Sequence, residues 1–133
     1  MDTNRLTVLL ANEQESWHRT VCGLLEPQGV RTLSVRSGRE VLDVMQRDEV
    51  HVAVLDIGMP LLGGMQVVKM MQQSPKSKNV PAILLADHPN DQLMHEALQL
   101  EVFSVLGKPV DFNVLLDSLA RVVKRHYKDK WPS

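Results

Sequence analysis

The carboxylate of Asp56 is the first candidate for chemistry in this sequence, because it follows VAVL (52–55), a run apolar enough to be buried. Gly58 and Pro60 come shortly after it. An acid in this position is either a turn former or a charge held at the rim of a sheet for a chemical purpose. The groups that follow the other apolar runs help to separate these two interpretations.

Three further apolar runs are followed by groups that could take part in chemistry. Asn12-Glu13 follows LTVLLA (6–11), Asp87 follows AILLA (82–86), and Lys108 comes shortly after the run 102–106. If these runs are parallel strands, their carboxyl ends meet at one edge of the sheet, where open α/β sheets bind ligands. Acids and a lysine would then converge on one site from separate strands, which favours a functional role for Asp56.

The elements that must position these groups are short apolar runs alternating with stretches of helical periodicity. Strands are expected at 6–11, 30–35, 51–55, 80–85 and 102–106, each followed by a helix. The last helix should begin at Asp111 and carry Leu115, Leu119, Val122 and His126 on one face. Five strand–helix units predict an α/β fold with a three-layer, doubly wound, flavodoxin-like parallel sheet, (βα)5, and helices on both faces.

Composition and charge indicate one globular domain over residues 1–133, which we expect to be a stand-alone protein. Lys and Arg number 15 against 16 Asp and Glu, so the net charge of −1 favours neither nucleic acid nor acidic lipid as a partner. No apolar segment has the length of a membrane span or a signal peptide. Cys22 is the single cysteine, and these features together predict a cytoplasmic protein without internal disulfides.

Five segments at these spacings resemble the receiver domain of two-component response regulators, in its single-domain chemotaxis-like form. They are VLLANE (8–13), LLEPQG (24–29), VLDIGMPLLGG (54–64), PAILLAD (81–87) and LGKPVD (106–111), and they cover nearly the whole chain. Enzyme classes on similar folds lack support: ANEQES (11–16) contains no glycine for a dinucleotide-binding turn, and Gly58 stands where a haloacid dehalogenase has its second Asp. The resemblance implies a signalling domain and not an enzyme that turns over a metabolite.

The resemblance also implies a role for each group at the rim. Asp56 would be the phosphoacceptor, a carboxylate nucleophile that becomes an acyl phosphate. Lys108 would place its charge on a phosphoryl oxygen, and the Lys108–Pro109 peptide is expected to be cis. A Mg²⁺ ion would be held by Asn12, Glu13, Asp56 and the backbone carbonyl of Gly58.

Several positions depart from the family pattern. Asn12 removes one acid from the metal site and Glu13 carries its charge on a longer arm, so weak Mg²⁺ binding is expected. Ala86 stands in place of a Thr or Ser, and Val105 in place of an aromatic residue, so both halves of the usual switch are missing. Asp87 brings a charge beside the acceptor, where it could repel a phosphoryl group or partly replace the lost metal ligand.

The implied partners are a histidine kinase or phosphotransfer protein as donor, and a downstream protein that binds near the last helices. The alternative is a degenerate receiver, a protein-interaction module that binds its partner regardless of phosphorylation. The altered positions favour this alternative, whereas Asp56 and Lys108 oppose it. Basic residues of the last helix and tail are read as a solvated face or a docking surface for an acidic partner, not for DNA. They are Arg121, Lys124, Arg125, Lys128 and Lys130.

Overall fold

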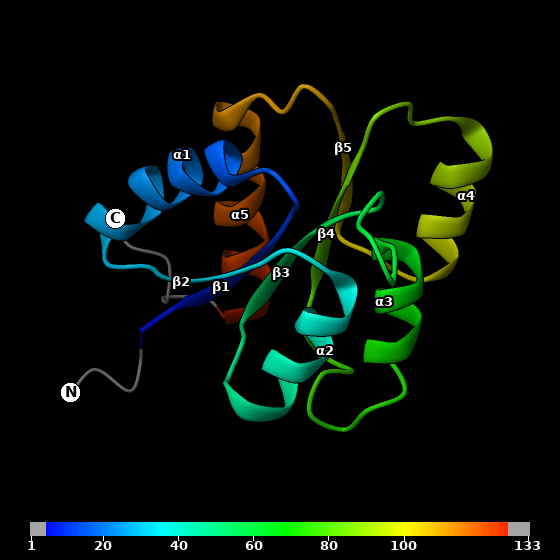
Figure 1. Ribbon diagram of the computed structural model, residues 1–133, viewed down its shortest axis with the longest axis horizontal. Coiled ribbons are helices and arrows are strands. Elements are labelled where there is room, and N and C mark those ends of the chain that lie inside the picture. Colours follow the sequence, from blue (N-terminus) through cyan, green and yellow to red (C-terminus); the bar gives the residue numbers. More distant parts are fainter. Residues whose placement is uncertain (1–4, 128–133) are drawn as a thin grey trace.

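Five parallel strands alternate with five helices over residues 5–127, the part of the chain that the computed structural model describes (Figure 1). The strands are β1 (Thr7–Ala11), β2 (Arg31–Val35), β3 (Val52–Asp56), β4 (Ala82–Ala86) and β5 (Ser104–Gly107). The helices are α1 (Glu15–Leu25), α2 (Gly38–Arg47), α3 (Gly64–Met71), α4 (Asp91–Gln99) and α5 (Phe112–Tyr127), with a 3-10 turn at Glu26–Gln28. The predicted fold class is confirmed.

The strand order is β2-β1-β3-β4-β5, with every neighbouring pair parallel. The direction of winding reverses between β1 and β3, so their carboxyl ends border the crevice in which doubly wound folds bind ligands. β3 ends one residue later than the sequence predicted, because Asp56 itself pairs with Leu85 of β4. Asp56 is therefore anchored in the sheet and is not part of the following loop.

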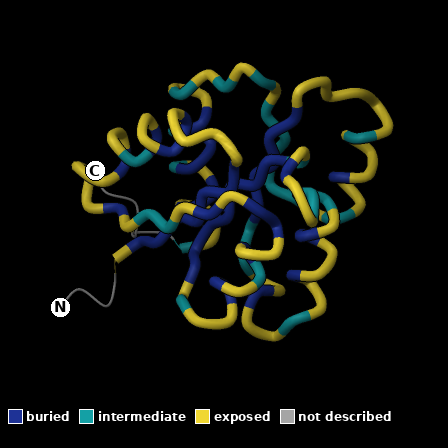
Figure 2. The backbone as a smooth tube through the Cα atoms, viewed as in Figure 1, coloured by how far each residue is buried: buried dark blue, intermediate teal, exposed yellow. Residues whose placement is uncertain are grey.

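Strands β1, β3 and β4 are buried along their whole length, as Figure 2 shows for the centre of the molecule. Because successive side chains of a strand point to opposite faces, each strand contributes to two separate cores. One core packs the strands against α1 and α5, and the other packs them against α2, α3 and α4. This burial on both faces explains the continuous apolar runs in the sequence.

One expectation about a helix face needs correction. His126 is exposed although it shares the period of Leu115, Leu119 and Val122, whereas Val123 is fully buried. In α4 only Ala97 is buried, and Leu98 is 71% exposed. A helical period gives the direction of a side chain but not whether the sheet extends far enough to cover it.

The basic residues Arg121, Lys124 and Arg125 are exposed on α5, and Lys128 and Lys130 lie outside the described residues. None of the helices within 5–127 combines the length and the apolar character that crossing a lipid bilayer requires.

Candidate functional site

Asp56 lies at the carboxyl end of β3 with both carboxylate oxygens engaged. Oδ1 accepts a hydrogen bond from the backbone N–H of Gly58 at 2.9 Å, and Oδ2 accepts one from Nζ of Lys108 at 2.5 Å. The residue is only 6% exposed. A carboxylate this buried needs a positive partner and hydrogen-bond donors, and it has both.

Lys108 is held in position by its backbone as well as by its ion pair. Its N–H donates to the carbonyl of Ala86 at 2.9 Å, which continues the β4–β5 ladder beyond the strands. The Lys108–Pro109 peptide is cis, as the resemblance implied. The predicted contact between Lys108 and Asp56 is therefore present, although 52 residues separate them in the sequence.

Asp87 lies on the Lys108 side of the site. Its Oδ1 is 3.8 Å from Nζ of Lys108, and its side chain is 71% exposed. In the sheet, β4 and β5 lie on one side of β3 and β1 lies on the other. Asp87 therefore adds its charge opposite the Asn12-Glu13 side, and this contact supports a role toward Lys108 over a role as a metal ligand.

Asn12 is buried, and its Oδ1, backbone N–H and carbonyl have partners within the protein. Its Oδ1 accepts from the N–H of Gln14 at 2.9 Å, which forms a turn ahead of α1, and its N–H donates to Val35. Its carbonyl accepts from Nε2 of His18 at 2.7 Å. The carbonyl has no proton to give, so Nε2 carries the hydrogen. The burial of His18 was not predicted from the sequence, although its position beside apolar Trp17 and Val21 was an available signal.

The residues proposed to hold Mg²⁺ form a donor set of low charge. Asn12 contributes an amide oxygen that already accepts one hydrogen bond, and Glu13 is exposed on the loop that follows β1. Within residues 5–127 no three His, Cys, Asp or Glu side chains are grouped closely enough to hold a metal ion. Two carboxylates, an amide and the Gly58 carbonyl are hard oxygen donors, so they fit Mg²⁺, but with less negative charge than a site with three acids.

The two altered switch positions are apolar and packed. Ala86 is fully buried at the end of β4, and Val105 packs against the core under α2, α3 and α4. Neither side chain has a group that can bond to a phosphoryl oxygen. The usual hydroxyl and aromatic partners are therefore absent at these two positions.

The loop after Asp56 folds back closely on the end of β3. A Cβ added at Gly63 would lie 2.6 Å from the carbonyl oxygen of Ile57, closer than any real side chain tolerates. Gly63 and Gly64 thus allow α3 to begin directly beside the end of β3.

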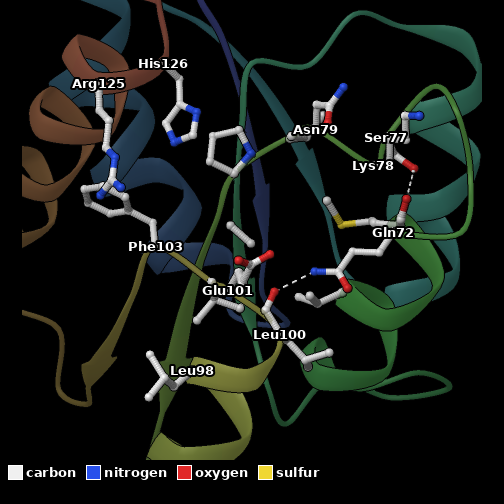
Figure 3. Close-up of a pocket in the computed structure, with 16 residues that line it drawn as sticks. Gln72, Ser77, Lys78, Asn79, Leu98, Leu100, Glu101, Phe103, Arg125 and His126 are labelled. Carbon is white, nitrogen blue, oxygen red and sulfur yellow. Dashed lines mark hydrogen bonds between the residues drawn. The ribbon is translucent and has the colours of Figure 1, made fainter.

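A cavity of about 710 Å³ lies at the opposite end of the sheet, where β4 and β5 begin (Figure 3). Gln72 reaches across to donate to the carbonyl of Leu100 at 2.6 Å, and the side chains of Arg125 and His126 border the cavity near Phe103. It contains none of the residues around Asp56 and belongs to a separate part of the surface.

The sequence of residues 8–120 matches the response regulator receiver domain, so the chain belongs to that family. Response regulator RR06 of Streptococcus pneumoniae is 24% identical over 95% of this chain, and the sensory/regulatory protein RpfC of Xanthomonas campestris pv. campestris is 26% identical over 86%. The chain spans only 58% and 16% of the lengths of these two relatives.

Solved structures show the same fold. Chemotaxis response regulator CheY4 of Vibrio cholerae superposes with a TM-score of 0.81 and 25% identity, over 89% of this chain and 98% of its own. A CheY-like receiver domain protein of Methanospirillum hungatei JF-1 gives a TM-score of 0.85 at 15% identity, over 94% and 98%, which supports the fold alone. Receiver domains are generally signalling modules that interact with histidine kinases or phosphotransfer proteins and bind Mg²⁺ at the phosphorylation site.

Proposed function

We propose that this protein is a two-component receiver that accepts a phosphoryl group on Asp56 and relays this state by protein–protein interaction. The observation that carries the proposal is the contact between Nζ of Lys108 and Oδ2 of Asp56 at 2.5 Å. It pairs a buried carboxylate nucleophile with a fixed positive charge at the switch point of the sheet. We place the protein in the cytoplasm, where its donor would be a histidine kinase or phosphotransfer protein.

In the proposed step, an oxygen of Asp56 forms a bond to the phosphorus of the donor while the bond from phosphorus to the donor histidine nitrogen breaks. The leaving imidazole keeps the electron pair and takes a proton from solvent. Lys108 then neutralises charge on a phosphoryl oxygen, since positioning and charge neutralisation are the main requirements of phosphoryl transfer. Mg²⁺ held weakly by Glu13, Asp56, the Gly58 carbonyl and Asn12 would supply further positive charge at this centre.

The relay would be a shift between two populations of the domain, read by a protein bound near the last helices. The exposed apolar side chains of Met94, Leu98 and Val114 on α4 and α5 support this location for the partner.

A degenerate receiver is the second candidate, and two observations favour it. The side-chain oxygen of Asn12 already accepts a hydrogen bond from the backbone N–H of Gln14, and Ala86 has no hydroxyl. The two candidates differ in one measurement, the intact mass after incubation with acetyl phosphate and Mg²⁺. The receiver gains one phosphoryl group, and Asp56→Asn gains none. If the wild type gains no mass at high donor and metal concentrations, the phosphorylated receiver is excluded and the protein acts as a phosphorylation-independent interaction module.

A further inference from the structure

Lys108 is shared between two carboxylates, one from Asp56 at the end of β3 and one from Asp87 directly after β4. Its ammonium is 2.5 Å from Oδ2 of Asp56 and 3.8 Å from Oδ1 of Asp87. Asp56 is buried and fixed by the sheet, whereas the side chain of Asp87 is 71% exposed. Of the two acids, Asp87 is the one that can move at little cost.

Asp87 is also the first residue of the segment that leads into α4. Residues 87–90 are all exposed, and Asn90 caps the helix by accepting from the N–H of Leu93 at 2.8 Å. On the strand side, the backbone of Lys108 is fixed to Ala86. The side chains of Asp87 and Lys108 therefore join the acceptor site to the exposed segment 87–90 at the start of α4.

Phosphorylation changes the charges around this shared ammonium. An acyl phosphate at Asp56 carries more negative charge than the carboxylate it replaces, and it requires Lys108 for a phosphoryl oxygen. Asp87 then faces a larger negative charge and loses its share of the ammonium. Because the group is exposed, the easiest response is an outward movement of Asp87 and its segment.

We propose that Asp87 is a positioning residue for Lys108, and that its repulsion from a phosphorylated Asp56 couples the acceptor to the first turn of α4. This inference rests on the proposed phosphorylation of Asp56. It gives the domain a coupling element at a place where Ala86 and Val105 have no group to supply one. The charge of Asp87 would also slow phosphorylation, because it repels the doubly negative phosphoryl donor as the donor approaches Asp56.

The test compares the wild type with Asp87→Asn, Asp87→Glu and Asp91→Asn. Asp91→Asn is a matched control, because it removes an exposed carboxylate four residues further along, on the first turn of α4. Each protein is incubated with acetyl phosphate and Mg²⁺, and phosphoryl uptake is followed by intact mass at low and high salt. Amide hydrogen exchange of the peptide 87–95 is then compared with and without the phosphoryl group.

Asp87→Asn is expected to take up the phosphoryl group roughly threefold to tenfold faster than the wild type at low salt, with the difference shrinking at high salt. On phosphorylation, exchange in 87–95 rises roughly threefold in the wild type, Asp87→Glu and Asp91→Asn, and stays unchanged in Asp87→Asn. A merely structural role of Asp87 would produce neither the salt dependence nor the rescue by Glu.

The inference is overturned if Asp87→Asn shows the wild-type rise in exchange at equal phosphoryl occupancy, or the wild-type uptake rate at every salt concentration. Both results leave Asp56 phosphorylation intact, because the mass gain is still observed. Absence of any mass gain in the wild type is a different outcome, which overturns the proposed function and this inference with it.

Discussion

Nζ of Lys108 lies 2.5 Å from Oδ2 of Asp56, although Asp56 ends β3, Lys108 follows β5, and β4 lies between these two strands. The ammonium is the positive partner of a carboxylate that has little contact with water. Removing it would leave a buried charge whose remaining hydrogen-bond donor, among residues 5–127, is the backbone N–H of Gly58.

Lys108→Ala should therefore lower the free energy of unfolding by about 1–3 kcal/mol at pH 7, below the cost for a fully buried pair because Lys108 is 24% exposed. Urea denaturation measures this change. The control is Lys69→Ala, which breaks an ion pair to Glu96 whose side chains are about half exposed and should cost no more than about 0.5 kcal/mol. Equal costs for the two variants would contradict the role given to Lys108.

Ala86→Thr should lengthen the lifetime of the phosphoryl group on Asp56 roughly twofold to tenfold, because the added hydroxyl can donate to a phosphoryl oxygen. The lifetime is measured by intact mass at intervals after removal of the donor. Ala86→Val is the matched control, since it adds the same shape without the hydroxyl and shares any packing cost at this fully buried position. The prediction fails if Thr and Val give the same lifetime.

Asn12→Asp should tighten Mg²⁺ binding roughly tenfold, because it restores a full negative charge to an oxygen site that has two carboxylates. The Asp side chain can still accept from the N–H of Gln14, so the turn before α1 is preserved. Isothermal titration calorimetry gives the affinity without any phosphorylation. Glu13→Gln should weaken binding by a similar factor; an unchanged affinity in both variants would place the ion elsewhere.

Tyr127 should make the protein less stable at high pH. Burial, and secondarily the charge of Glu49, raises the pKa of its phenol above the ordinary 10.0, and its hydroxyl donates to the carbonyl of His51 at 2.7 Å. Because the folded state holds this proton more tightly than the unfolded chain, the stabilisation is complete below pH 10.0 and is lost as the pH rises through the raised pKa.

The single tyrosine of the chain makes this prediction directly measurable by the absorbance of its phenolate. Tyr127→Phe should lose about 1 kcal/mol at pH 8 and should lack the additional loss of stability above pH 10.0. A phenolate midpoint at or below the ordinary value in the folded protein would refute the assigned environment.

Gly38→Ala should destabilise the protein by about 2–3 kcal/mol, because the new Cβ would clash with the backbone carbonyl oxygen of Leu62. This contact joins the start of α2 to the loop after Asp56. Gly23→Ala is the control within α1: no atom lies within 4 Å of its new Cβ, so a gain of about 0.5–1 kcal/mol is expected from helix propensity. Thermal and urea unfolding of the two variants should move in opposite directions.

Most of the fold could be predicted from the sequence, because the patterns that define strands and buried helix faces are local. The run VAVL (52–55) is buried on both sides, as its continuous apolar character indicated, and Asp56 stands at its end. The exposed His126 shows where this reasoning fails, since periodicity does not show how far a neighbouring layer extends.

The sequence by itself determined which groups follow the strands, and therefore that Asp56 and Lys108 would come to the same edge of the sheet. Only the tertiary structure decided how these groups pair. The side chain of Lys108 turns toward Asp56, and the side chain of Asp87 turns toward Lys108. The physical reason is that these pairings depend on strand order and on side-chain rotamers. Strand order places β1 and β4 on opposite sides of Asp56. Both strand order and rotamers are set by long-range packing, which no local sequence pattern encodes.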